Sequence, residues 1–153
     1  MGDVESFLAH AIALEREAAR RYEDLTAAMQ TEGNAEVKVF FARMAYYSRK
    51  HLSEAMARGG FRELPAMAPE EYDWPDGTGP ETAVWAGVDG YIDRAEALRL
   101  ALEAERRGHA YYAAIAALAQ DAELRAIAGE FATEEAEHVA ELERLIAQHA
   151  AAR

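Results

Sequence analysis

Residues 133–138 read TEEAEH, and they place a carboxylate and an imidazole on a helix face that should be apolar. Around this stretch leucine, isoleucine and phenylalanine recur at steps of three and four, the period of a helix that buries one face. The same steps carry Glu135 and His138 onto that face. A buried carboxylate is costly unless a cation compensates it, so this helix predicts a cationic partner or a bound ion.

The rest of the chain also favours helix. Its 153 residues are 51% hydrophobic, which suits one domain with a substantial core, and alanine, leucine, glutamate and arginine dominate. All four prolines lie between residues 65 and 80, so they divide the chain into two helical halves. We predict a single all-α domain over residues 1–153, with helices over about 3–32, 34–58, 89–120 and 121–150 and a crossover over 60–88.

The two halves repeat one another. Each begins with an aspartate suited to cap a helix, followed by a glutamate 12 residues later and a tyrosine seven residues after that. In each half the second helix places a histidine 17 residues after its own capping residue. The repeated residues are Asp3, Glu15, Tyr22 and His51 in the first half, and Asp93, Glu105, Tyr112 and His138 in the second. Two helical hairpins joined by a long crossover predict an antiparallel four-helix bundle.

Five polar residues interrupt the predicted inner faces at one height. At about 1.5 Å per residue, Glu15 and His51 lie nearly level in the first hairpin, and the second hairpin gives the same result. The five are Glu15, His51, Glu105, Glu135 and His138. No lysine or arginine lies on these faces to compensate the acids. Oxygen and imidazole ligands suit iron or manganese, so we predict a metal site, with a di-iron centre preferred over manganese or another divalent metal.

The chain resembles the rubrerythrin-like branch of the ferritin-like superfamily over essentially all four helices. The stretches that carry the resemblance are EREAARRY (15–22), RKHL (49–52), ERRGHAYY (105–112) and EEAEH (134–138). It implies a non-haem di-iron centre acting on hydrogen peroxide or O₂. It also implies terminal ligands Glu15 and Glu105, a bridging ligand Glu135, one imidazole per iron from His51 and His138, and hydrogen bonds to ligand carboxylates from Tyr22 and Tyr112.

Two departures from that family limit what it implies. The family has a glutamate three residues before the histidine of the second helix, and here that position is Ser48. His109, one turn after Glu105, is a candidate replacement ligand. The chain also has no cysteine and therefore no rubredoxin-type iron. Electrons must come from an external donor or from incoming Fe(II).

Three functions remain open at this point. The first is a rubrerythrin-type peroxidase or oxidase, and the second is an iron-binding ferroxidase or storage protein. The third is a structural ferritin-like module whose metal site has degraded at Ser48.

The charge pattern bears on partners and location. The formal net charge is −12 with no basic cluster, so we expect no nucleic-acid partner. The N-terminus lacks the basic start of a signal peptide, and no apolar run reaches about 18 residues, so we expect no membrane association and a cytoplasmic location. We also expect a homo-oligomer, with a homodimer as the simplest form.

Several other side chains carry weaker expectations. His10 and His149 have no convergent partners in the pattern, and we expect both to face solvent. Trp74 and Trp85 lie in the crossover, and we expect them to pin it to the bundle or to a second subunit.

Overall fold

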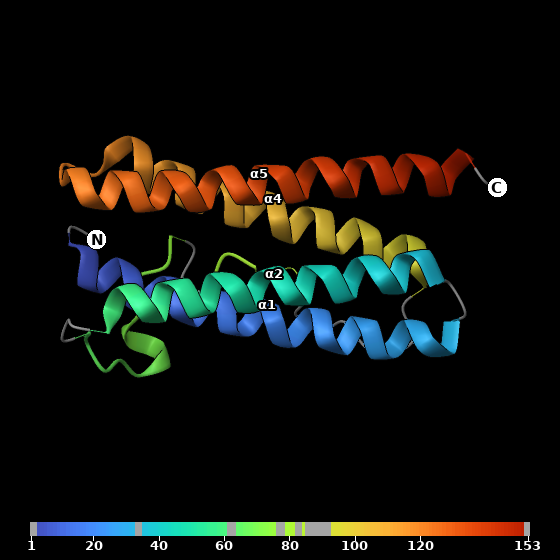
Figure 1. Ribbon diagram of the computed structural model, residues 1–153, viewed down its shortest axis with the longest axis horizontal. Helices are drawn as coiled ribbons and strands as arrows, with labels where there is room; N and C mark the ends of the chain where they lie inside the picture. Colours follow the sequence, from blue (N-terminus) through green and yellow to red (C-terminus); the bar gives the residue numbers. More distant parts are fainter. Residues whose placement is uncertain are drawn as a thin grey trace.

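Four long helices form a bundle in the computed structural model (Figure 1). The structure describes residues 3–32, 35–60, 64–75, 79–81, 84 and 93–151, and no strand lies among them. The helices are α1 (Val4–Glu32), α2 (Ala35–Gly59), α4 (Arg94–Leu118) and α5 (Ala122–Ala151), with a short 3₁₀ helix, η1 (Pro69–Glu71), in the crossover. The predicted all-α four-helix bundle is confirmed.

Aspartate caps fix three of the helix starts. Asp3, Asp93 and Asp121 each accept a hydrogen bond from the backbone N–H three residues on, at 2.7, 2.8 and 2.9 Å. Because Asp93 is extended, α4 begins at Arg94 and not at the predicted residue 89, and residues 89–92 lie outside the described part. The helix ends at Leu118, two residues early, where Arg125 donates hydrogen bonds to the carbonyls of residues 119 and 120. The predicted cap Asn34 also lies outside the described residues.

The helices pair as two hairpins. In Figure 1, α1 runs beside α2, and α4 runs beside α5, with the crossover joining the end of α2 to the opposite end of the molecule, where α4 begins. The hairpins face each other along the bundle's length. Any site built from inward-facing side chains therefore draws on both halves of the sequence.

The core forms two apolar clusters with a polar layer between them. One contains Phe41, Met44, Leu98 and Leu142, and the other contains Phe7, Leu8, Leu124 and Phe131. Along every helix the chain passes from one cluster to the other, and Glu15, His51, Glu105, Glu135 and His138 lie between the clusters. The apolar clusters therefore hold the polar layer away from both ends of the bundle.

The crossover is fastened to α1 through His10, whose predicted exposure was wrong. His10 is only 1% exposed. Its Nδ1 donates to the carbonyl of Ser6 at 2.8 Å, and its Nε2 accepts from the backbone N–H of Asp73 at 2.9 Å. Tyr72 and Trp74 pack edge-on against its ring. The partner that buries His10 comes from an irregular segment, which periodicity in the sequence cannot reveal.

Trp74 packs as expected for a residue that fastens the crossover. Besides His10, its ring contacts Tyr111 of α4 at 5.4 Å between centroids. Trp85 and the side chain of His149 lie outside the described part of the chain. No helix in the described part is both long and apolar enough to cross a membrane.

Candidate metal centre

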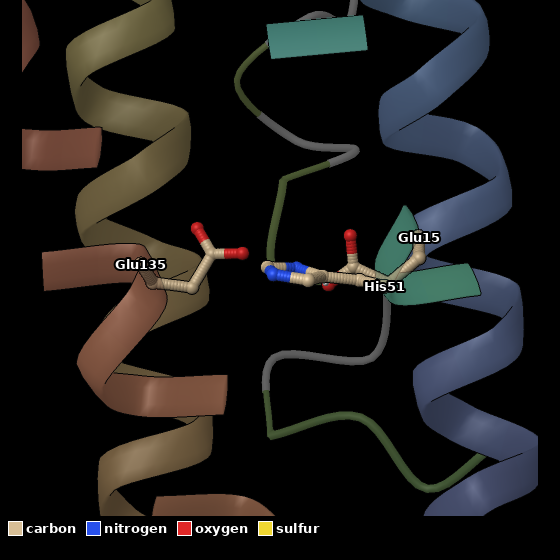
Figure 2. Close-up of side chains that lie close together, drawn as sticks. All are labelled: Glu15, His51 and Glu135. Carbon is tan, nitrogen blue, oxygen red and sulfur yellow. Dashed lines mark ion pairs between the residues drawn. The ribbon is translucent and has the colours of Figure 1, made fainter. Parts of the chain in front are cut away.

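The polar layer brings together all five residues predicted as ligands. Glu15 comes from α1, His51 from α2, Glu105 from α4, and Glu135 and His138 from α5. Each is at most 7% exposed. In Figure 2 the side chains of Glu15, His51 and Glu135 point toward one another from three different helices.

The five residues form two overlapping groups. Glu15, His51 and Glu135 can each offer a ligand atom within 4.8 Å of the others, and so can Glu105, Glu135 and His138. Glu135 belongs to both groups. One carboxylate shared by two groups, each with its own glutamate and histidine, provides donors for two metal ions, and Glu135 could contribute to either.

Two buried tyrosines hold the outer carboxylates in place. Tyr22 of α1 donates to Glu105 of α4 at 2.5 Å, and Tyr112 of α4 donates to Glu15 of α1 at 2.8 Å. Burial, and then the neighbouring carboxylates, raise the pKa of both tyrosines well above the ordinary value. Both hydroxyls therefore stay protonated and serve as donors. Each hairpin orients an acid of the other hairpin.

The histidines turn Nδ1 inward. His51 Nδ1 lies 3.7 Å from Glu15 Oε1, and His138 Nδ1 lies 3.6 Å from Glu105 Oε2. The outward Nε2 of His51 contacts the carboxylate of Glu134. A neutral His51 that donates its Nε2–H to Glu134 presents the lone pair of Nδ1 to the site, and this is how a carboxylate usually orients a metal-binding histidine. This role of Glu134 was not predicted from the sequence, although the sequence shows that Glu134 lies one helical turn before His138.

The two central acids, Glu105 and Glu135, have pKa values shifted in opposite directions. Burial, and then the charge of Glu105, raise the pKa of Glu135 well above its ordinary value. Burial also opposes ionisation of Glu105, but its interactions with Glu135 and His138 and the hydrogen bond from Tyr22 outweigh that effect and lower its pKa. The pair thus keeps a proton on Glu135, which a divalent ion would displace.

The inward atoms fit a metal centre. Four of them have no hydrogen-bond partner among the described residues: His51 Nδ1, His138 Nδ1, Glu105 Oε2 and Glu135 Oε2. Buried polar atoms are nearly always partnered, and leaving one unpartnered costs about 1–3 kcal/mol. Nitrogen and carboxylate oxygen atoms converging in this way are the donor set of iron or manganese sites.

A fourth acid, Glu81, enters the layer from the crossover. It is 6% exposed. Burial, followed by the charges of Glu105 and Glu15, raises its pKa well above the ordinary value. Sequence reasoning missed Glu81 because it lies in an irregular segment with no helical period. The sequence offered one signal, Gly108, on the inner face of α4. Because glycine has no side chain, another group must fill the space at that buried position.

Comparison with known proteins places the chain in a family. A family model described as a ferritin-like domain matches residues 3–148. The chain belongs to the ferritin-like domain family. Among solved structures, this ferritin-like chain is similar to an uncharacterised conserved protein from Magnetospirillum magnetotacticum MS-1, with 38% identity, 95% of each chain covered and a TM-score of 0.79. A search of curated proteins found no match.

The structure shows where two residues that bear on the predicted ligand set lie, Ser48 and His109. Ser48 is buried on the inner face of α2, so the position at which the rubrerythrin resemblance implies a glutamate carries no carboxylate here. His109 is half-buried, and it belongs to neither ligand group found among the described residues. Glu81 also belongs to neither group, but unlike His109 it is buried, at 6% exposure, and the charges of Glu105 and Glu15 act on it.

A small opening leads to the histidines between α2 and α5. This cavity of about 130 Å³ is lined by Tyr47, Lys50, His51, Glu134, Glu137, His138 and Glu141. Three of these residues are acids on α5. The opening is wide enough for an ion or a small molecule such as peroxide, and its acids favour the approach of cations.

Proposed function

We propose that this protein is a di-metal oxidoreductase of rubrerythrin type that reduces hydrogen peroxide or O₂. The observation that carries the proposal is the pair of buried Glu–His groups that share Glu135, with four inward atoms lacking partners. The donor set favours iron, with manganese or another divalent metal as the alternative. The resemblance of the ligand-bearing stretches to rubrerythrins supports peroxide or O₂ as the substrate.

The chain's own residues would provide geometry and selectivity. A bound pair of redox-active ions would supply the two electrons that convert H₂O₂ and two protons into two molecules of water. Tyr22 and Tyr112 keep Glu105 and Glu15 in fixed orientations, and Glu134 fixes the ring of His51. The cavity of about 130 Å³ between α2 and α5 would offer peroxide a route to the histidines. With no cysteine, the protein would take electrons from an external donor, in keeping with a cytoplasmic location.

Anaerobic loading with Fe(II) tests this proposal. We expect two irons per chain, and peroxide consumption that continues when a reductant is supplied. Glu135→Gln removes the shared carboxylate and should lose both properties, whereas Glu137→Gln, an exposed neighbour on α5, should retain them. Wild-type protein that binds two irons but leaves peroxide and O₂ untouched would refute the oxidoreductase.

The acidic opening supports a second candidate, an iron-oxidising or iron-storing protein. Glu134, Glu137 and Glu141 line the route by which Fe(II) would enter. Many irons per chain after aerobic loading, in a large homo-oligomer, would favour this alternative. Two irons with multiple peroxide turnovers in a smaller assembly such as a homodimer would favour the oxidoreductase.

A further inference from the structure

We propose that Glu81 is a ligand of the metal centre, supplied by the crossover and not by a helix. This inference rests on the proposed metal-binding function and adds a residue to the same site. It assigns to the crossover the carboxylate that the second helix lacks at Ser48.

The carboxylate of Glu81 lies in the space that Gly108 leaves open. A Cβ atom built on Gly108 would stand 3.1 Å from Glu81 Oε2 and 3.5 Å from Glu135 Oε2. The two carboxylates therefore both border the space beside Gly108 on the inner face of α4. Glu81 belongs to neither ligand group as the side chains stand, but it lies beside Glu135, the acid that both groups share.

Glycine at position 108 has a cost that this role explains. Inside a helix, glycine is about 1 kcal/mol less favourable than alanine. Gly108 lies three residues after Glu105 and is buried on the same face of α4. Alanine there would place its Cβ closer to the Glu81 carboxylate than nine in ten Cβ contacts, so the carboxylate would have to shift by a few tenths of an ångström. The position keeps the less favourable residue where a carboxylate needs the room.

The negative charge of the buried carboxylates in the polar layer also favours cations near Glu81. No ion pair within the described residues involves Glu81, and the charges that act on it most strongly belong to Glu105 and Glu15. Burying carboxylates together without a cation is unfavourable. Four carboxylates, Glu15, Glu81, Glu105 and Glu135, carry four negative charges when ionised, and two divalent cations balance them with neutral histidines. Three carboxylates would leave a net positive centre.

The backbone around Glu81 is held by the core. Its carbonyl accepts a hydrogen bond from the N–H of Val84 at 3.2 Å, and Val84 is buried in the same apolar cluster as Leu98 and Leu142. Glu81 is therefore presented to the site by an anchored turn. Ligation through its side chain would fasten this part of the crossover to the metal centre.

Metal titration of Glu81→Gln tests the inference, with Glu71→Gln as the matched control. Both variants remove one acid from the crossover, but Glu71 is exposed on η1. The metal-free proteins are titrated with Mn²⁺ and Co²⁺ by calorimetry, and the Co²⁺ absorption spectrum is recorded. We expect two ions in the wild type and in Glu71→Gln. In Glu81→Gln at least one ion should bind ten- to a hundredfold more weakly, with an altered Co²⁺ spectrum.

Two further readouts separate ligation from a structural role. The metal-free Tm of Glu81→Gln should equal or exceed that of the wild type, because the amide removes a buried acid without changing its shape. Metal should protect the chain around residues 79–84 from proteolysis in the wild type but not in the variant. Wild-type affinities, stoichiometry and spectrum in Glu81→Gln would overturn the inference while leaving the metal centre intact. A wild type that binds no ion would instead overturn the proposed function.

Discussion

Glu134 contacts His51 across the interface between α2 and α5, although it is not among the predicted ligands. Carboxylates in this position fix both the tautomer and the orientation of a metal-binding imidazole. Burial lowers the pKa of His51, but Glu15 and then Glu134 outweigh burial, and the net shift is upward. The orientation of His51 therefore depends on a residue at the rim of the site.

Glu134→Gln should weaken metal binding ten- to a hundredfold without loss of the fold. The amide can turn its N–H₂ toward His51 Nε2 and favour the tautomer that places the proton on Nδ1. Affinity is measured by Mn²⁺ titration. The control is Glu137→Gln, which alters the same opening at an exposed position. Equal affinities for the two variants would show that Glu134 does not orient His51.

Gly108 and Gly129, which lie in the interior of α4 and α5, predict different outcomes on substitution by alanine. Gly129 of α5 has open space around an added Cβ, so Gly129→Ala should raise the free energy of unfolding by about 0.5–1 kcal/mol and leave metal affinity unchanged. Gly108→Ala should gain less stability and bind metal on the order of tenfold more weakly, because the Cβ displaces Glu81. Denaturant unfolding and metal titration of both variants provide the check. Matching behaviour at the two sites would contradict the role given to Gly108.

At the scale of elements, the crossover is fixed to α1 by a neutral histidine. Burial lowers the pKa of His10, although its hydrogen bond to Ser6 and the charge of Asp73 oppose this effect. His10 Nε2 accepts a hydrogen bond from the N–H of Asp73, and a protonated ring would lose that capacity. The anchor therefore favours the uncharged form.

This anchor should make stability depend on pH. Because the folded pKa of His10 lies below its unfolded value of about 6.5, the unfolded chain binds the proton more readily, and stability falls as pH drops below about 6.5. In thermal unfolding of the metal-free protein, the wild type should lose Tm more steeply than His10→Gln between about pH 6.5 and 5. His109→Gln, a half-buried histidine without such an anchor, should follow the wild type. Parallel curves for His10→Gln and the wild type would exclude the effect.

The sequence predicted well those elements in which apolar residues follow the helical period or a capping residue marks the start of a helix. The stripe that carries Glu135 and His138 lies where steps of three and four put it, and Asp93 caps α4 as its spacing to Glu96 suggested. The burial of Glu81 was missed because it lies in the crossover, and that of His10 because its partner Asp73 does. Irregular backbone has no repeat from which the direction of a side chain can be read.

At the scale of the molecule, bound metal should stabilise the whole bundle, because its ligands come from both hairpins. A free ion at 100 times its dissociation constant adds about 2.7 kcal/mol per site, which corresponds to a rise in Tm of about 5–10 °C for a chain of this size. Thermal unfolding with increasing Mn²⁺ measures the shift. Glu135→Gln should abolish most of it. A wild-type Tm indifferent to Mn²⁺, Fe²⁺ and Co²⁺ alike would support a structural module with a degraded site.

The reciprocal tyrosine bonds have a consequence for how the two halves of the chain relate. The acid of each hairpin finds its donor only on the opposite hairpin, Tyr22 for Glu105 and Tyr112 for Glu15. A hairpin packed on a partner without the matching tyrosine would bury its carboxylate without that donor. Each half therefore lacks the tyrosine donor for its own acid. Two identical hairpins related by a twofold axis could have supplied each other's donors in the same way, before the two were joined in one chain.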